Sequence, residues 1–384
     1  MKRFCLVGLV VFSAIAIQTA RAADAIEVLC PGNYEIFQRQ RVSAGPVRIR
    51  GRVNGVAGTV QVRWTGTPLA GQLPEGWQSI QKEATGTFSA EVSIPAGGWY
   101  VLEIRVIAPN QPLAVARVEH VGVGEVFVVA GQSNSTNYGA ERQKPRSGLV
   151  SSFDGSTWQP ADDPQPGTQD RSQGGSFLPA FGDAIAERYH VPVGLASCGA
   201  GATSVRQWLM KGEKIEIRPT TDRCVKTIGP NQWECTGQLY DGLLKRMNAL
   251  GPHGFRAVLW HQGESDAGQA ADRQITGEQY SALLEKIIRS SRKDVGWDVP
   301  WFVAQATYHS STDPANSEFR AAQKAISDDG VALLGPDTDT FGADYRTGVH
   351  FNAKGLKAHG ELWAGKVAGY LDSVLSAQEK HPLR

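Results

Sequence analysis

The stretch VFVVAGQSNSTNYG, residues 126–139, places a serine directly after an apolar run. The run ends at Gly131, and a short apolar segment ended by glycine predicts a buried strand of a sheet. Ser133 follows, between Gln132 and Asn134. A serine in this place is a candidate nucleophile, but it can equally cap a helix, so the rest of the chain must distinguish the two roles.

From Gly124 onward, short apolar runs alternate with segments of helical spacing. This alternation predicts the α/β class, with a doubly wound parallel sheet and helices between its strands. Ligands of such sheets lie outside the carboxyl ends of the strands, so the residues after each strand are candidate site residues. Strands are predicted over residues 125–131, 191–197, 257–263, 301–306 and 331–336, and helices over residues 177–190, 238–251, 280–293, 318–329 and 353–375.

The preceding part of the chain has a different pattern. Between Ile26 and Glu119, apolar and polar residues alternate with period two, and Gly/Pro-rich turns separate the runs. This pattern is typical of a small immunoglobulin-like β-sandwich. We therefore predict a β-sandwich domain over residues 24–120 and an α/β domain over residues 121–384, joined by a short link at residues 120–125.

The N-terminus predicts export. Lys2 and Arg3 precede an apolar run over residues 4–17, and Ala20-Arg21-Ala22 has the small-x-small pattern of a cleavage site. Residues 1–22 are therefore predicted to be a signal peptide, because the apolar run is too short to span a membrane comfortably. The protein is expected in the periplasm or outside the cell, without membrane insertion.

Composition and charge indicate which kinds of ligand and partner the protein is not expected to bind. The 384 residues carry a formal net charge of +1 and show no basic stripe, so nothing indicates a nucleic-acid partner. No Cys-x-x-Cys or Cys/His cluster indicates a metal. Four cysteines follow the predicted cleavage site, and a disulfide between Cys224 and Cys235 is the preferred pairing, whereas Cys30 and Cys198 either form a second bridge or stay free. The oligomeric state is left open.

Four polar, glycine-containing loops follow the predicted strands and contain the groups that acyl transfer needs: a nucleophile, a base, and donors to an oxyanion. Ser133 is the candidate nucleophile and His350 the candidate base. The backbone N–H groups of Ser133 and Gly201 and the amide of Gln262 are candidate oxyanion donors. His261 and His309 also follow strands, and we rank them below His350 as bases.

The same residues have structural alternatives. Ser133 can be a capping residue, His350 a structural histidine, and Glu264 one half of a surface salt bridge. The glycines near Gly201 can serve only a tight turn. The arrangement of all four loops at one sheet edge favours the catalytic reading. Ser135 occupies the last position of Gly-x-Ser-x-Gly, so the nucleophile elbow of lipase-type hydrolases is not present.

With these motifs, the chain resembles the SGNH hydrolases, in particular the sialate O-acetylesterase-like carbohydrate esterases. The resemblance covers about residues 121–375. It implies a flavodoxin-like three-layer α/β/α fold and metal-free, cofactor-free removal of O-acetyl groups from a carbohydrate. The motifs that carry it are GQSN at 131–134, GATSVRQW at 201–208, WHQGESD at 260–266 and GVHFNAKG at 348–355.

The resemblance implies a role for each matching position. Ser133 matches the nucleophile and His350 the base, and the oxyanion donors match Ser133, Gly201 and Gln262. Thr347 stands where many SGNH enzymes have the aspartate that orients the histidine. Candidates for the missing acid are, in order, Glu264, Asp344 and Asp266. Substrate contacts are expected from Asn134, His261 and Trp208.

Other functions stay open from the sequence. The leading hypothesis is an exported serine esterase acting on an acetylated glycan or a small acetylated sugar through an acetyl-enzyme. A lipolytic or thioester-cleaving SGNH hydrolase is the alternative enzyme. A non-catalytic glycan-binding protein is the alternative outside enzymes, because tryptophans such as Trp158 can stack on sugars.

Overall fold

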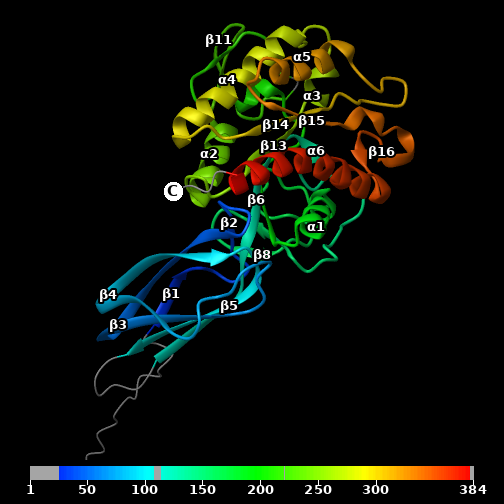
Figure 1. Ribbon diagram of the computed structural model, residues 1–384. Helices are drawn as coiled ribbons and strands as arrows, with labels where there is room; N and C mark the ends of the chain where they lie inside the picture. The colour runs from blue at the N-terminus through cyan, green and yellow to red at the C-terminus, as the bar shows by residue number, and fades with distance from the viewer. Residues whose placement is uncertain (1–25, 108–113, 220, 381–384) are drawn as a thin grey trace, which may run out of the picture.

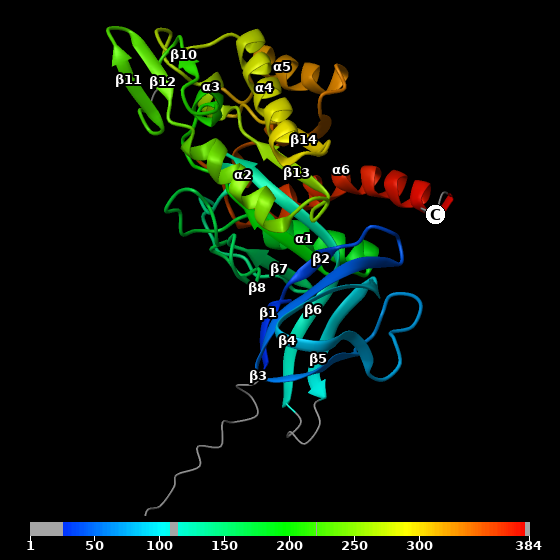
Figure 2. The same cartoon turned by 90° about the vertical axis from the view of Figure 1, so that its left-hand side faces the viewer.

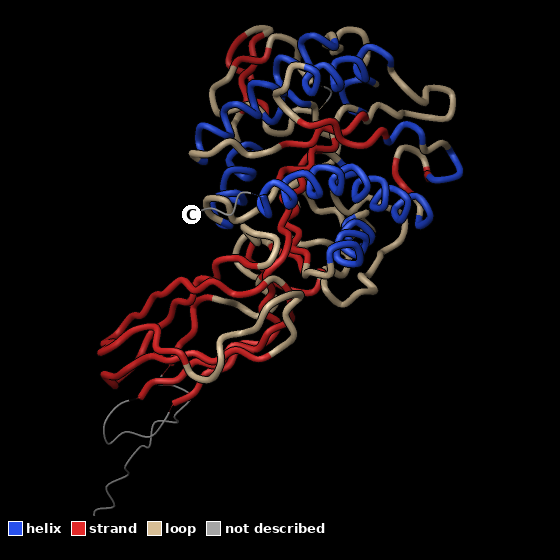
Figure 3. The backbone as a smooth tube through the Cα atoms, viewed as in Figure 1, coloured by secondary structure: helices blue, strands red, loops and turns tan. Residues whose placement is uncertain are grey.

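The computed structural model describes residues 26–107, 114–219 and 221–380. It has a lower region of long strands and an upper region in which helices surround a second set of strands (Figure 1). Figure 3 shows the helices in blue, gathered in the upper region, and the strands of the lower region in red. The predicted signal peptide, residues 1–22, lies outside the described residues.

The lower region consists mainly of antiparallel strands with one buried face. In β3 (Ala44–Thr65), Val47, Ile49 and Val53 are buried, whereas Arg50 between them is exposed. Successive side chains of a strand point to opposite faces, so this alternation buries one face of the strand. The predicted strand-rich character of this part is confirmed. Its other strands are β1 (Ile26–Cys30), β2 (Ile36–Gln38), β4 (Gln78–Pro95) and β5 (Gly97–Ile107).

The upper region contains a run of six strands in which every neighbouring pair is parallel. The predicted alternation of strands and helices is confirmed, and the protein is a mixed α/β protein with a large sheet. A short antiparallel partner of the first strand, β8 (Trp158–Pro160), was not predicted, because neither strand of that hairpin has a long apolar run. The order of the six is β7 (Val150–Phe153), β9 (Val193–Ser197), β6 (Ala114–Gly131), β13 (Ala257–His261), β14 (Trp301–Gln305) and β15 (Leu333–Asp337).

Helices cover both faces of the parallel strands. Phe127 and Val129 of β6 belong to a core with one set of helices, whereas Val126 and Val128 belong to a core with the other set. Both faces of β6 are therefore buried, which explains its continuous apolar run. The first set is α1 (Leu178–Tyr189) and α6 (Ala353–Lys380), and the second is α2 (Gln238–Leu250), α4 (Gly277–Val295) and α5 (Ser317–Asp328).

The strand β6 belongs to both regions (Figure 2). Its first part pairs with β5 and β2, for example Gly122 with Ile36, and its second part pairs with β9, beginning at Glu125 with Val193. The expected link at residues 120–125 is therefore an internal part of one continuous strand. The predicted boundary at 120/121 falls inside this strand.

A buried ion cluster ties the two regions together at this strand. Glu125 is fully buried, and its carboxylate accepts hydrogen bonds from Arg39 and Arg256, each at 2.7 Å from Nε. Gln38 donates to the same carboxylate at 2.9 Å. Burial by itself raises the pKa of Glu125, but the two arginines and the Gln38 bond outweigh it, so the pKa lies below the usual value. The ionised carboxylate is therefore matched by partners from both regions.

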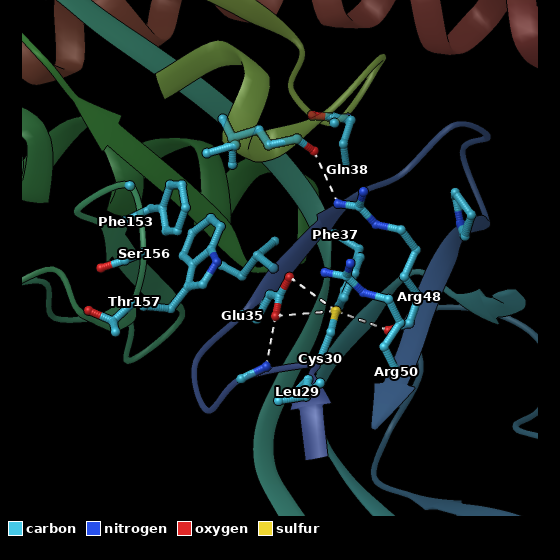
Figure 4. A pocket seen from close by; sticks show the side chains of 18 of the residues that line it. Leu29, Cys30, Glu35, Phe37, Gln38, Arg48, Arg50, Phe153, Ser156 and Thr157 are labelled. Carbon is cyan, nitrogen blue, oxygen red and sulfur yellow. Dashed lines mark hydrogen bonds between the residues drawn. The ribbon is translucent and has the colours of Figure 1, made fainter. Parts of the chain in front are cut away.

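A cavity of about 710 Å³ lies at the same junction (Figure 4). Arg48 and Arg50 of β3 line it from the lower region, and Phe153 and Trp158 line it from the β7–β8 hairpin. The Arg48 guanidinium donates to the backbone oxygen of Leu250 at 3.1 Å, at the end of α2. The cavity is thus walled by both regions and is separate from the carboxyl ends of the central parallel strands.

The predicted disulfide is wrong. Cys30, Cys198, Cys224 and Cys235 are all free and buried. Although Cys224 lies beside the β11 (Val225–Gly229) and β12 (Gln232–Cys235) hairpin, its thiol contacts Gln238, whereas the Cys235 thiol donates to the backbone oxygens of residues 207 and 209. Each thiol has contacts of its own, and both cysteines are free in this structure despite their proximity in sequence.

Within the described part of the chain, no helix is both long and apolar enough to cross a bilayer.

Candidate active site

Gly131 ends β6 and turns the chain toward the site. Its φ is +127°, and a Cβ at this position would lie 2.0 Å from the backbone oxygen of His261. Only glycine permits this approach of the two strand ends. The chain then enters the short 3-10 helix η2 (Ser133–Ser135), which positions Ser133 at the edge of the sheet.

Gln132 joins the loop after β6 to the loop after β13. Its side-chain oxygen accepts hydrogen bonds from the backbone N–H of Gly263 at 3.3 Å and of Ser265 at 3.0 Å. The amide of Gln262 also donates to it, at 3.3 Å. The GQSN and WHQGES segments, 130 residues apart in sequence, are therefore held in one fixed arrangement at the carboxyl ends of adjacent strands.

A cavity of about 300 Å³ opens at this edge of the sheet. Ser133, His350 and Glu264 line it together, which brings the expected nucleophile, base and first-choice acid to one site. Ser133 is only 5% exposed, so its hydroxyl is accessible through this cavity rather than on an open surface. The other lining residues are Gln132, Tyr138, Ala202, Gln207, Thr221, Ser265, Gly268, Gln269, His309 and Val349.

His350 lies in a small hairpin before α6. The hairpin pairs β16 (Arg346–Thr347) with β17 (His350–Phe351), and Thr347 is the register partner of His350. The His350 ring stacks on Tyr138 with centroids 5.0 Å apart. Burial lowers the pKa of His350 below 6.5, the nearby Glu264 carboxylate opposes this shift, and Arg346 adds to it. His350 is therefore held largely neutral near pH 7, as a base must be.

Glu264 begins the short helix α3 (Glu264–Ala267) and is 3% exposed. Its Oε1 accepts hydrogen bonds from Asn134 Nδ2 at 2.8 Å and lies 3.0 Å from His261 Nε2. Its Oε2 is buried and has no hydrogen-bond partner among the described residues. Burial by itself raises the pKa of Glu264, but His261 and the hydrogen bonds outweigh this effect and lower the pKa. Glu264 is thus an ionised carboxylate with one free oxygen.

The other two candidate acids lie elsewhere. Asp344 is exposed, and its one hydrogen bond in the described chain runs from Asn352 to its backbone oxygen. Asp266 is buried, but its carboxylate accepts from Ser204, Val205 and Gln262. The Asp266 oxygens hold the loop after β9 to the loop after β13, which favours Glu264 over Asp266 as the acid.

Two expected oxyanion donors are engaged with other acceptors. The Gly201 N–H donates to the Asp170 carboxylate at 2.6 Å. The Gln262 amide donates to Asp266 at 2.6 Å and to the backbone oxygen of Thr203 at 3.1 Å. In this structure both donors are occupied by these acceptors, so their role toward an oxyanion stays a prediction that requires the present hydrogen bonds to open. No hydrogen bond from the Ser133 N–H is found within the described residues.

The three expected substrate contacts are buried in this structure, and none of them lines the cavity. Trp208 is fully buried, donates to Thr203 and packs against Trp260, so it is a core residue. His261 is also fully buried and bonded to Glu264. Asn134 is 6% exposed, and its amide holds Glu264 and the backbone oxygen of residue 349. All three support the site from behind rather than line its cavity.

Several residues of the site carried no separate signal in the sequence. Tyr138 lines the cavity from just after the GQSN motif, and Ala202 lines it from within the GATSVRQW motif. His359, in the middle of α6, lies behind the cavity and reaches His261 at 3.2 Å. Asp170 lies in a long irregular loop for which the sequence pattern predicts neither a strand nor a helix. Helical periodicity explains the burial of His359, which is why its polar contact was missed.

The family comparison defines the class of protein. A family model described as carbohydrate esterase, sialic acid-specific acetylesterase matches residues 123–368, well over half of the chain. The chain therefore belongs to this family, and it is a carboxylic ester hydrolase of the carbohydrate acetylesterase class. The sequence-based recognition of such an esterase is confirmed. A search of curated proteins found no match.

Solved structures add a likeness in fold. A carbohydrate acetylesterase from Xanthomonas citri has a TM-score of 0.53 at 17% identity, over 88% of this chain and 73% of its own. At this identity the likeness shows a shared fold. A protein from Arabidopsis thaliana has a TM-score of 0.45 at 18% identity, over 65% of this chain and 98% of its own. A carbohydrate esterase family 2 enzyme with a carbohydrate-binding domain, from Corynascus thermopiles, has a TM-score of 0.39 at 16% identity, over 90% and 99%.

Proposed function

We propose that the protein is an exported serine esterase that removes O-acetyl groups from a carbohydrate, with Ser133 as nucleophile, His350 as base and Glu264 as orienting acid. One observation carries the assignment: these three side chains line one cavity, and Glu264 keeps a buried oxygen without a partner. A buried carboxylate oxygen is costly to leave unbonded. Oε2 is therefore the natural acceptor for a ring N–H of His350.

The proposed reaction has two half-reactions. Ser133 Oγ attacks the acetyl carbonyl carbon while His350 takes its proton, and the proton then passes to the leaving sugar oxygen. The acetyl-enzyme is hydrolysed when His350 takes a proton from water, and acetate and free Ser133 result. The Ser133 N–H is the proposed donor to the oxyanion, and Gly201 can join only if it releases Asp170.

We assign residues 121–384 to a flavodoxin-like SGNH domain and residues 24–120 to an immunoglobulin-like sandwich that braces it. The Glu125 cluster supports bracing, because partners from both regions hold one buried carboxylate. The N-terminal sequence supports export to the periplasm or the outside.

The size of the cavity favours acetyl over longer acyl groups. About 300 Å³ lies at the lower end of the range for small-molecule sites, and that volume must also admit part of a sugar. A series of nitrophenyl esters from acetyl to octanoyl tests this choice. We expect kcat/KM to fall as the chain lengthens, whereas a lipolytic or thioester-cleaving enzyme would prefer the longer chains.

Ser133→Ala tests the mechanism. We expect acetate release from acetylated xylan and from p-nitrophenyl acetate to fall by about 10³-fold or more, because the nucleophile has no substitute. Thermal unfolding of the variant checks that the fold is kept. Wild-type rates in Ser133→Ala would exclude the mechanism, and glycan binding by the wild type without acetate release would favour a non-catalytic binding protein.

A further inference from the structure

The cavity at the junction of the two regions has more than twice the volume of the cavity at Ser133. The two volumes are about 710 Å³ and about 300 Å³. Small-molecule sites usually have volumes of about 300–1,000 Å³ and often lie between domains. Both the size and the position of the junction cavity therefore fit a ligand site.

One wall of the junction cavity is an aromatic surface. The half-buried ring of Trp158 stacks on Phe153, with centroids 4.9 Å apart and 25° between the planes. A Cβ on Gly194 would lie 2.8 Å from the Trp158 ring, so glycine lets the ring lie close to β9. No hydrogen bond from the indole N–H of Trp158 is found in the described part of the chain. The ring is thus supported from behind, and its N–H stays available to a ligand.

The turn before Trp158 is fixed by the Asp154 carboxylate. Its Oδ1 accepts from the backbone N–H groups of Ser156 and Thr157 at 2.6 and 2.7 Å and from the Ser156 hydroxyl at 2.8 Å, and its Oδ2 accepts from the Thr157 hydroxyl at 2.8 Å. Burial by itself raises the pKa of Asp154, but these bonds lower it to about 2. Both hydroxyls line the cavity, and because they donate to Asp154, their lone pairs remain as acceptors.

The opposite wall carries two arginines. Arg48 and Arg50 are two residues apart on β3, so they lie on the same face of the strand, and both line the cavity. Arg48 donates to the backbone oxygen of Leu250, whereas Arg50 is exposed beside the Cys30 thiol. Neither guanidinium has a carboxylate within ion-pair distance among the residues that the structure describes. The N–H groups of Arg50 are therefore donors for a ligand.

Two carboxylates line the same cavity. Glu35 Oε2 accepts from the backbone N–H of Gly32 at 2.7 Å, whereas Glu35 Oε1 has only the Cys30 thiol, at 3.8 Å. Figure 4 shows Glu35 between the arginines on one side and Ser156 and Thr157 on the other. The second carboxylate, Glu91, is the register partner of Arg48. Two carboxylates and two guanidinium groups favour an uncharged ligand that both donates and accepts hydrogen bonds, as hydroxyl groups do.

We infer that the junction cavity is a second carbohydrate-binding site, which holds uncharged sugar units of a glycan between Trp158 on one side and Arg50 and Glu35 on the other. The apolar C–H face of a sugar ring packs on the indole, and its hydroxyls bond to the guanidinium and to the free carboxylate oxygen. The inference goes beyond the proposed function, because this site uses none of the groups at Ser133.

The two sites are far apart along β6. The backbone N–H of Arg39, between cavity-lining residues 38 and 40, donates to the oxygen of Gly124 at 2.7 Å. At about 3.3 Å per residue, the strand from Gly124 to Gly131 separates the junction cavity from the active-site loop by about 20 Å. A small ester therefore reaches Ser133 without the second site. A glycan chain held at the junction has its other acetylated units at a raised effective concentration near Ser133.

Calorimetry on the wild-type protein tests binding without requiring activity. The neutral probes are deacetylated xylan, galactomannan and mixed-linkage β-glucan, and polygalacturonate is the charged comparison. We expect at least one neutral glycan to bind, and to bind more tightly than polygalacturonate. Binding of none of the three neutral glycans would overturn the inference, and a preference for polygalacturonate would overturn the assignment of an uncharged ligand.

Substitutions assign the binding to the junction cavity. We expect Trp158→Ala to raise Kd by about tenfold, because aromatic anchors contribute much of the binding energy of an interface. Trp158→Phe should stay within about threefold of the wild type, and Arg50→Gln should raise Kd by about threefold or more. The control is Arg52→Gln, on the same face of β3, whose partner is Glu27 and which does not line the cavity. Unchanged Kd in both Trp158→Ala and Arg50→Gln would overturn the inference.

Kinetics separate the second site from the active site. For the acetylated form of the glycan that binds, we expect Trp158→Ala to raise KM by about tenfold with little change in kcat. The constants for p-nitrophenyl acetate should stay at the wild-type values. An equal loss on both substrates would indicate a distorted active site and contradict the inference.

The outcomes also separate this inference from the proposed function. If Ser133→Ala stays active, the proposed mechanism fails while the binding result stands. If Ser133→Ala is inactive but no neutral glycan binds, the esterase mechanism stands and the inference fails. If thermal unfolding shows that Trp158→Ala does not fold, Arg50→Gln, at an exposed strand position, decides the assignment.

Discussion

Asn134 Nδ2 lies 2.8 Å from Glu264 Oε1 and 3.2 Å from the backbone oxygen of Val349. One side-chain amide therefore connects the loop of the nucleophile, the acid and the residue before His350. Glu264 and Val349 are 130 and 215 residues from Asn134 in sequence. The amide fixes their relative positions, because its two donor hydrogens serve two different loops.

Replacing Asn134 by alanine should loosen this connection. We expect kcat for acetyl esters to fall by about tenfold to a hundredfold with a smaller change in KM, because small displacements of catalytic groups have effects of this size. Steady-state kinetics on p-nitrophenyl acetate measure both constants. Unchanged kcat in a folded Asn134→Ala protein would show that the amide does not position the site.

Glu264→Gln and Asp344→Asn form a matched pair that identifies the acid. Both substitutions remove one negative charge with almost no change in shape. We expect Glu264→Gln to lower kcat by about 10²- to 10⁴-fold, because an orienting acid can contribute about 10⁴. Asp344→Asn should stay near the wild type, since this side chain is exposed. A loss below about tenfold in Glu264→Gln would exclude Glu264 as the acid.

The pH dependence follows from His350. The base must be neutral, and burial lowers its pKa below 6.5, so activity is retained in mildly acidic solution and is lost as the pH falls through this lowered pKa. Glu264 opposes the shift, so Glu264→Gln should move the acid limb of kcat/KM to a still lower pH. A plot of log kcat/KM from pH 4 to pH 9 tests both statements, and an acid limb above pH 6.5 in the wild type would contradict them.

Glu125→Gln should destabilise the fold. Removing one charge of a buried cluster leaves its partners uncompensated, and such changes decrease the free energy of unfolding by about 3–5 kcal/mol. The pKa of Glu125 is lowered by folding, so its contribution is present above the unfolded pKa and is lost as the pH falls through the folded pKa.

The control for this substitution is Glu27→Gln. Glu27 pairs with Arg52 at 3.0 Å, and both side chains are about half exposed, so the loss should stay below about 1 kcal/mol. Denaturant unfolding at pH 7 measures both variants. Equal effects of the two substitutions would show that the buried cluster adds nothing to stability.

Much of the fold could be predicted because its signals are local. The apolar run before Gly131 predicts β6, and the helical spacing of residues 238–250 with Gly251 after them predicts α2 and its end. The hairpin of β7 and β8 could not be predicted in this way, because its strands are short and are stabilised by pairing and by packing such as that of Phe153 on Trp158.

The site could be predicted only as a set of residue types. The motifs predicted that Ser133, His350 and Glu264 lie at one edge of the sheet, and all three line the same cavity. The hydrogen-bond partners depend on three-dimensional geometry, which is why Gly201 and Gln262 were expected to face an oxyanion although they bond to carboxylates. Trp208 illustrates the same limit, because the sequence does not show whether an aromatic side chain contacts a sugar or packs in the core.

The continuous strand β6 couples the unfolding of the two regions that it connects. Its first part pairs with strands of the lower region and its second part with strands of the upper region, so unfolding of either region disturbs the same backbone. Opening near residues 122–125 also separates Glu125 from Arg39. A cut after residue 120 would leave unpaired strand edges on both fragments, which are sites of aggregation. The two halves are thus mechanically coupled, and heat or denaturant should disrupt them as one cooperative unit.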